Sequence, residues 1–174
     1  MYKRILVCGG NGAGKSTLGK ALAQALEFEF MDVEDYYFPR DDSNYKYGVV
    51  RTKEQVNALL LGDMKRHACF VLASVKGNFD EKVRAEFDCA VYVHVSKEIR
   101  LQRVQDRSYR QFGDRMLPGG DLYEREQKFF DMVRSRPENE VMESLKSLNV
   151  PIIRLDGTLS VADNVQNAKQ LILK

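Results

Sequence analysis

The sequence has no long hydrophobic run, few cysteines and almost no excess of charge. None of its segments approaches the roughly 18 consecutive apolar residues that a membrane-spanning helix needs. The apolar run after the Lys3-Arg4 pair is too short for a signal peptide, so we expect a cytoplasmic protein without a membrane partner. Cys8, Cys69 and Cys89 lie far apart in apolar runs and form no C-x-x-C pair. We expect them to be reduced residues of the core.

The charge balance argues against a nucleic-acid partner. The chain carries 27 basic and 25 acidic residues, interspersed along 174 positions, for a formal net charge of +2. A binder of nucleic acid usually presents a stronger basic surface. With 44% hydrophobic residues, no internal repeats and no low-complexity linker, the sequence predicts a single globular domain over residues 1–174.

Short apolar runs alternate with segments of helical period, which is typical of βαβ units and a parallel sheet. Several runs, such as FVLASV and AVYVHV, are apolar on successive residues, which indicates strands covered by helices on both faces. We expect strands at Tyr2–Cys8, Glu29–Val33, Cys69–Val75, Cys89–Val95 and Pro151–Leu155. We expect helices at Lys15–Ala25, Thr52–Arg66, Asp80–Phe87, Lys97–Ser108, Leu122–Arg136, Glu138–Leu148 and Val161–Leu173.

Two segments, 34–51 and 109–120, are predicted to be irregular, and irregular segments of this length inside a domain are usually binding loops or lids. Ser96 and Ser160 are expected to cap helices, and Asp121 with Glu124 resembles a capping box.

The stretch GGNGAGKST joins the first expected strand to the first expected helix. Gly9, Gly14, Lys15 and Ser16 satisfy G-x-x-x-x-G-K-[ST] in the strand-turn-helix context that this phosphate-binding motif requires. Glycines allow the backbone N–H groups to converge on phosphate oxygens, and the helix N-terminus adds partial positive charge. Lys15 is expected to reach the β- and γ-phosphates of ATP, and the Ser16 hydroxyl to bind Mg²⁺. The predicted nucleotide contacts are Gly10, Asn11, Gly12, Ala13, Gly14, Lys15, Ser16 and Thr17.

With this motif at its start, the chain resembles the small P-loop kinases, among them adenylate, shikimate, uridine and nicotinamide-riboside kinases. The resemblance covers nearly the whole chain in element order. It implies a three-layer α/β/α fold with a five-stranded parallel sheet in the order 2-3-1-4-5 and a mobile lid at about 108–122. The sequence lacks the N-K-x-D motif of GTPases and the LSGGQ motif of transporter ATPases.

Asp32, Glu34 and Asp35 lie at the carboxyl end of the second expected strand, where ligands bind in open α/β sheets. One carboxylate can hold Mg²⁺ through water, and another can orient the acceptor hydroxyl and take its proton. Asp32-x-Glu34 is similar to the D-x-D of shikimate kinase, whereas Glu34-Asp35-Tyr36-Tyr37 is similar to a segment of uridine kinases. The first alignment makes Asp32 the metal residue; the second, which we favour slightly for the acceptor, makes Asp35 the base.

Other residues after this strand are candidates for contact with the acceptor. The expected acceptor-binding region is about 34–66, with Glu34, Asp35, Tyr36 and Arg51 as its binding residues. The four tyrosines of the region form either an aromatic wall or ordinary loop packing: Tyr36, Tyr37, Tyr45 and Tyr47. The third strand lacks the terminal aspartate of many P-loop ATPases and has Ser74 in its place.

An arginine row follows the fourth strand, with Arg100, Arg103, Arg107 and Arg110 on one helix face. Planar, bidentate donors suit phosphates. The resemblance implies that Arg103 and Arg107 close over the transferred phosphate; the alternative is an exposed basic helix. It also implies that the backbone of the loop with Asp156 and Gly157 packs against the adenine of the nucleotide. An ordinary strand-to-helix connection without a binding role explains this loop equally well.

We therefore expect a kinase that transfers the γ-phosphoryl group of ATP, with Mg²⁺, to a nucleoside, nucleotide or other small hydroxyl compound. The alternative is an ATP-binding regulator with little turnover, which the missing aspartate favours. A polynucleotide kinase is disfavoured, because binding a polynucleotide usually requires a more basic surface. The chain is expected to act as a monomer or homodimer.

Overall fold

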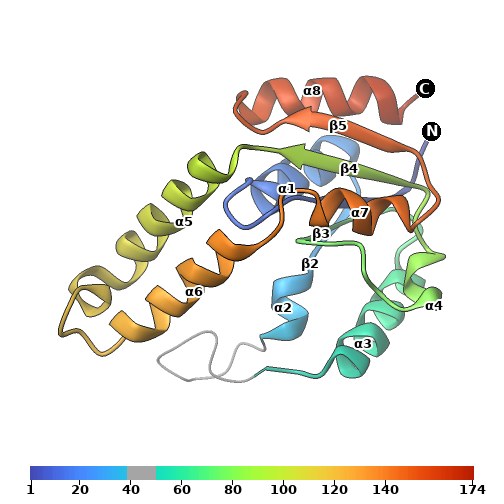
Figure 1. Ribbon diagram of the computed structural model, residues 1–174. Coiled ribbons are helices and arrows are strands. Elements are labelled where there is room, and N and C mark those ends of the chain that lie inside the picture. Colours follow the sequence, from blue (N-terminus) through green and yellow to red (C-terminus); the bar gives the residue numbers. More distant parts are fainter. Residues whose placement is uncertain (39–49) are drawn as a thin grey trace.

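The computed structural model describes residues 1–38 and 50–174 and contains one five-stranded parallel sheet. The strands follow the order β2-β3-β1-β4-β5, as the family resemblance implied. Leu6 of β1 pairs with Leu72 of β3 on one side and with Ala90 of β4 on the other. The strands are β1 (Arg4–Cys8), β2 (Glu29–Asp32), β3 (Phe70–Ser74), β4 (Cys89–His94) and β5 (Ile152–Asp156) (Figure 1).

The helices confirm the predicted α/β alternation, with two short additions, α2 and the 3₁₀ turn η1, and several shifted ends. The short helix α2 lies within a segment predicted to be irregular, and α5 continues four residues past its expected end at Ser108. The helices are α1 (Lys15–Leu26), α2 (Val33–Tyr37), α3 (Lys53–Arg66), α4 (Glu81–Arg84), α5 (Lys97–Phe112), the 3₁₀ turn η1 (Gly113–Met116), α6 (Tyr123–Ser135), α7 (Glu140–Lys146) and α8 (Val161–Ile172).

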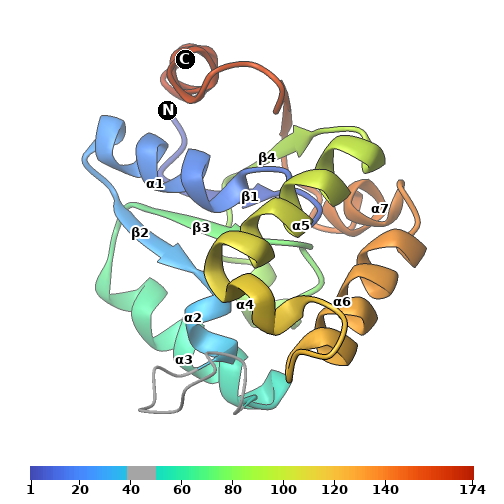
Figure 2. The same cartoon turned by 90° about the vertical axis from the view of Figure 1, so that its left-hand side faces the viewer.

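Helices cover both faces of the sheet, which explains the continuous apolar runs of the strands. Side chains alternate along β1, so that Ile5 and Val7 pack toward α1 and α8, whereas Leu6 and Cys8 pack toward α3, α4 and α7. Figure 2 shows α1 and α8 on one side of the sheet and α3 on the other. Cys8 and Cys89 are buried and reduced, as expected, and Cys69 is partly buried. Burial raises the pKa of Cys89 to about 12, so this thiol is unreactive at neutral pH.

The segment expected to be a lid, about 108–122, connects α5 to α6 in a helical hairpin that has a small core of its own. Val104 of α5, Met116 of η1 and Phe130 of α6 are buried against one another. The predicted capping box at Asp121 is wrong, because Leu122 occupies the N-cap of α6 and makes no side-chain capping bond. The Asp121 carboxylate instead accepts two hydrogen bonds from the Arg115 guanidinium, at 3.0 and 2.7 Å.

Candidate active site

The glycine-rich loop between β1 and α1 turns through backbone conformations that L side chains rarely adopt. Gly12 has φ +83°, and Gly14, which is the N-cap of α1, has φ +88°. The Ala13 amide donates to the Gly10 carbonyl at 3.0 Å, which closes the turn. Lys15 and Ser16 are therefore the first two residues of α1, at the positive end of the helix dipole.

Arg100, in the first turn of α5, packs against this loop. It is only 8% exposed, its Nε donates to the Val95 carbonyl at 3.1 Å, and its guanidinium lies so close to Gly10 that an added Cβ would be 2.2 Å from Nη1. The sequence grouped Arg100 with three other arginines on one helix face that would bind phosphate. The structure corrects this for Arg100, which is a buried support of the loop.

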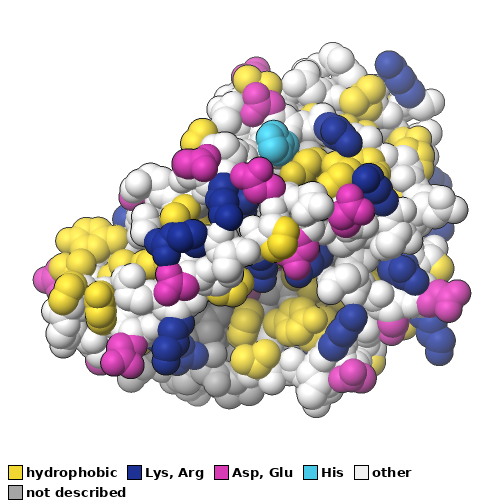
Figure 3. All heavy atoms as spheres, viewed as in Figure 1, with side chains coloured by type: hydrophobic (Ala, Val, Ile, Leu, Met, Phe, Trp, Pro, Cys, Tyr) yellow, Lys and Arg dark blue, Asp and Glu magenta, His cyan; other side chains and the backbone are white. Residues whose placement is uncertain are grey.

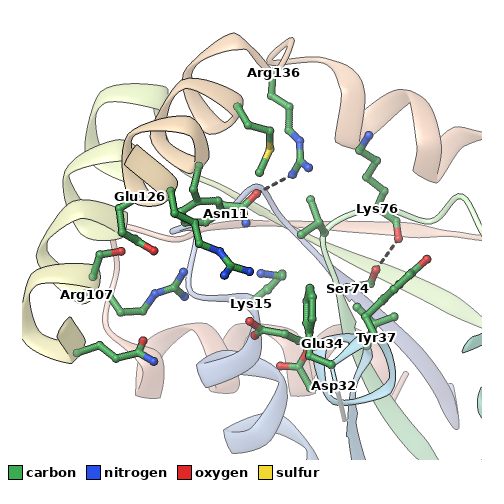
Figure 4. A pocket seen from close by; sticks show the side chains of 18 of the residues that line it. Asn11, Lys15, Asp32, Glu34, Tyr37, Ser74, Lys76, Arg107, Glu126 and Arg136 are labelled. Carbon is green, nitrogen blue, oxygen red and sulfur yellow. Dashed lines mark hydrogen bonds between the residues drawn. The ribbon is translucent and has the colours of Figure 1, made fainter. Parts of the chain in front are cut away.

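A cavity of about 490 Å³ opens beside the loop. Its wall includes Lys15 from α1, Asp32 and Glu34 from the β2–α2 junction, and Arg107 from α5. Figure 4 shows the four side chains directed into the same space. The structure thus brings together four of the predicted site residues from three separate parts of the chain.

Lys15 experiences opposing influences in this cavity. Burial lowers its pKa from the usual value, whereas the carboxylates of Asp32 and Glu34 raise it and the Arg107 guanidinium lowers it. Desolvation is the largest of these effects. A lysine ammonium so placed is stabilised by any further negative charge that enters the cavity.

The two alignments of the acidic segment predicted different bases, and the structure separates their residues. Asp32 ends β2 and caps α2, where its Oδ1 accepts from the Glu34 amide at 3.0 Å. Asp32 and Glu34 line the cavity, whereas Asp35 is exposed and is not part of its wall. The geometry favours the Asp32/Glu34 pair over Asp35, which the sequence had slightly favoured.

The remaining predicted acceptor residues are engaged elsewhere. The Tyr36 hydroxyl donates to Asp63 Oδ2 at 2.6 Å, and burial together with this bond raises the pKa of Tyr36. The Arg51 guanidinium donates to the Tyr36 carbonyl at 2.9 Å and does not line the cavity. Tyr37 does line it, whereas the other two tyrosines, Tyr45 and Tyr47, lie outside the described residues.

A chain of polar contacts that the sequence analysis missed joins the loop to the far side of the cavity. Arg136, directly after α6, donates from Nη1 to Asn11 Oδ1 at 2.6 Å, and its Nε lies 3.7 Å from Glu140 Oε2. The Lys76 ammonium donates to Glu140 Oε1. Lys76 and Arg136 thus share one partly buried carboxylate, while both line the cavity (Figure 4). Next to them the Ser74 hydroxyl donates to the Lys76 carbonyl at 2.8 Å.

Arg103 and the loop after β5 lie beside the glycine-rich loop. The Arg103 guanidinium donates to the Gly157 carbonyl at 3.1 Å and is not part of the cavity wall. A Cβ on Gly157 would lie 3.0 Å from the Ala13 carbonyl oxygen, so the two loops are in direct contact. The Asp156 carboxylate accepts from the amide and hydroxyl of Thr158, which lower its pKa. Arg103 thus tethers the β5–α8 loop to α5.

Glu126, on the α6 side of the cavity, was also missed by the sequence analysis. Glu126 is 2% exposed and occupies an inward position of the helix, in the same buried stripe as Phe130 and Val133. An acidic residue within a helical apolar stripe was the signal that could have found it. Figure 3 shows basic and hydrophobic side chains together around the hollow below α6.

The donors of the site fit a nucleotide with a divalent cation better than a metal held by protein alone. Within residues 1–38 and 50–174, no three His, Cys, Asp or Glu side chains cluster as metal ligands. Mg²⁺ in kinases is held by one or two protein oxygens together with substrate phosphates. The oxygens predicted for such a site are those of Ser16, in the first turn of α1, and of Asp32, on the cavity wall. None of the helices in the described part of the chain combines the length and apolarity needed to cross a bilayer.

The sheet order, the glycine-rich loop and the cavity define a P-loop protein of the kinase type. Residues 5–128 match the sequence family described as an AAA domain, and the chain belongs to that family. It is 27% identical to the uncharacterized protein YqaC of Bacillus subtilis (strain 168), over 95% of this chain and 94% of the relative. It is 25% identical to shikimate kinase of Hahella chejuensis (strain KCTC 2396), over 98% of this chain and 82% of the relative. Shikimate kinase from Bacteroides thetaiotaomicron, a solved structure 19% identical, has the same fold with a TM-score of 0.62 and full coverage of both chains.

Proposed function

We propose that the protein is a small-molecule kinase that transfers the γ-phosphoryl group of ATP to a hydroxyl acceptor. The observation that carries the proposal is the convergence of Lys15, Arg107, Asp32 and Glu34 in one cavity beside the glycine-rich loop. Two cations suit the β- and γ-phosphates, and two carboxylates suit a metal and an acceptor hydroxyl. The kinase relatives support the same class of reaction.

In this proposal the loop from Gly10 to Thr17 binds the phosphates through its backbone, and Lys15 neutralises the transferred group. Ser16 and Asp32 would hold Mg²⁺, which supplies charge neutralisation of the phosphates when bound. Arg107 stabilises charge that develops on the γ-phosphoryl oxygens. Arg103 and the loop of Asp156 and Gly157 would back the nucleotide from outside the cavity.

The acceptor side of the reaction is assigned to Glu34. The acceptor oxygen forms a bond to the γ-phosphorus, while the bond to the bridging oxygen breaks and its electron pair leaves with ADP. The hydroxyl proton passes to the Glu34 carboxylate, which lies in the cavity beside the Asp32 that caps α2. Asp35, exposed and outside the cavity wall, has no part in this step.

Comparison of acidic variants tests this assignment. We expect Glu34→Gln to lower kcat about 100-fold or more, in line with the loss of a positioned base, and Asp32→Asn to raise the Mg²⁺ requirement. Asp35→Asn, the matched control one residue away, should change kcat less than about threefold, as expected for an exposed group outside the wall. An Asp35→Asn variant as inactive as Glu34→Gln would return the base to Asp35.

A second function, an ATP-binding regulator, is favoured by one observation. The end of β3 has Ser74 where many P-loop ATPases have an aspartate, and the Ser74 hydroxyl is committed to the Lys76 carbonyl. Tight Mg·ATP binding without turnover on any hydroxyl compound would support this function. Loss of Mg·ATP binding in Lys15→Ala is expected for both functions, and binding that survives this change would contradict both.

A further inference from the structure

The wall of the cavity away from the glycine-rich loop contains a group of apolar and aromatic side chains among its polar ones. α2 and the residue after it supply Tyr37 and Phe38, whereas the end of α5 supplies Phe112 and α6 supplies Phe129 and Met132. α2 and α6 face each other across the cavity (Figures 1 and 4). Flat apolar side chains on two opposing sides suit a flat ring between them.

The charges of this region disfavour an acidic acceptor. Lys76 and Arg136 are already paired with Glu140, and Arg136 also donates to Asn11. An acceptor carboxylate at this position would compete with Glu140 for both cations, at the cost of weakening the pairing of a partly buried carboxylate.

The carboxylates of the wall add to this effect. Asp32, Glu34 and the buried Glu126 all border the same space, so an anionic acceptor would meet like charge. Arg125 and Glu126, adjacent on α6, contribute one charge of each sign. Lys15 and Arg107 are assigned to the phosphates of ATP in the proposed function. A buried carboxylate such as that of Glu126 accepts hydrogen bonds from N–H or O–H donors of a neutral ligand.

We propose that the acceptor is an uncharged hydroxyl compound with a flat unsaturated ring, of the nucleoside type, and not a small hydroxy acid. This inference rests on the proposed kinase function and narrows its substrate. The ring lies between the α2 side and the α5–α6 side of the cavity, and a donor of the ring or sugar bonds to Glu126. Shikimate, which gives the shikimate kinase relatives their name, is a hydroxy acid and is disfavoured by the same charges.

A substrate panel separates this inference from the proposed function. ADP release with Mg·ATP is measured in the presence of neutral purine and pyrimidine nucleosides, shikimate or gluconate. We expect at least one nucleoside to stimulate ADP release and neither acid to do so. Stimulation by an acid alone overturns the nucleoside inference and leaves the kinase function intact. Tight binding of Mg·ATP with no stimulation by any compound overturns the kinase function itself.

Two variants test the structural reasons. Phe129→Leu keeps an apolar side chain against the small core of the helical hairpin but removes the aromatic ring. It should raise the acceptor KM about 5- to 100-fold, as for loss of one aromatic stacking partner, and leave the Kd of Mg·ATP unchanged. Tyr109→Leu is the matched control, because Tyr109 is 51% exposed on α5 and does not line the cavity. Equal acceptor KM values for Phe129→Leu and the wild type would contradict the stacking site.

The second variant, Glu140→Gln, releases Lys76 and Arg136 from their shared carboxylate. By calorimetry we expect it to bind shikimate or gluconate at least tenfold more tightly than the wild type does. Circular dichroism and thermal unfolding check that the variant is folded. A folded Glu140→Gln protein with no gain in acid binding would overturn the charge argument.

Discussion

Alanine substitution at two glycines of the phosphate loop gives a quantitative test of how the loop is built. Gly12 and Gly14 have nearly the same φ, +83° and +88°, so alanine at either position carries the same cost of a left-handed conformation, roughly 1–2 kcal/mol. Their surroundings differ. A Cβ on Gly14 would meet nothing within 4 Å, whereas a Cβ on Gly12 would lie 2.2 Å from the Arg100 carbonyl oxygen and 2.9 Å from its carbon.

The Gly12 clash is with the backbone of α5 and cannot be relieved by rotation of a side chain. Forced overpacking of this kind costs typically about 1–3 kcal/mol. We therefore expect Gly14→Ala to lower the free energy of unfolding by about 1–2 kcal/mol and Gly12→Ala by about 2–5 kcal/mol. Gly62→Ala is the control, because Gly62 is a helical residue of α3 with open space around it. It should leave stability unchanged or raise it by up to about 1 kcal/mol.

The assay is urea unfolding of the nucleotide-free protein, followed by circular dichroism, with all three variants measured under one set of conditions. The nucleotide is left out so that altered ATP binding does not enter the comparison. Equal losses for Gly12→Ala and Gly14→Ala would refute the close approach of the loop to α5. A Gly62→Ala loss as large as either would show that the glycine effects do not arise from φ.

Two further outcomes follow from ionisable groups, Lys15 in the cavity and Tyr36 outside it. Burial lowers the pKa of Lys15 below that of the unfolded chain, so the charged lysine destabilises the nucleotide-free protein, and Lys15→Met should be more stable than the wild type at neutral pH. This stability difference should shrink as the pH rises through the lowered pKa toward 10.5. A stability difference that stays constant up to that pH would contradict the desolvation of Lys15. Tyr36→Phe removes the 2.6 Å hydrogen bond to Asp63 and should lower the free energy of unfolding, measured by urea titration, by about 1–3 kcal/mol. Asp63→Asn keeps an acceptor for the Tyr36 hydroxyl and should lower the free energy of unfolding by less.

The sheet was predictable from the sequence because its strands are buried on both faces. The runs around Leu6, Leu72 and Val91 are apolar on successive residues, a pattern that long-range packing does not alter. α2 was not predictable in this way. Its five residues are too few to show a helical period, and Asp32 serves both as the end of β2 and as the N-cap of the helix.

The residues of the site were predictable only where a local sequence pattern determines the position of the side chain. The glycine-rich loop is a local motif, but the depth of an arginine along α5 depends on what packs against each turn. Arg100 is buried beneath the loop, Arg107 borders the cavity, and Arg103 between them turns to Gly157. The contact of Arg136 with Asn11 spans 125 positions of sequence, so no local spacing could indicate it.

The buried Arg100 side chain holds the first turn of α5 in place. Its first turn is wedged between the phosphate loop and the end of β4, while its last turns carry the hairpin that borders the cavity opening. A rigid rod clamped at one end cannot swing about that end, so any opening of the hairpin must bend α5 beyond Arg100 or unwind it near Gly113. Arg100 therefore supports the floor of the phosphate loop and also holds the fixed end of α5.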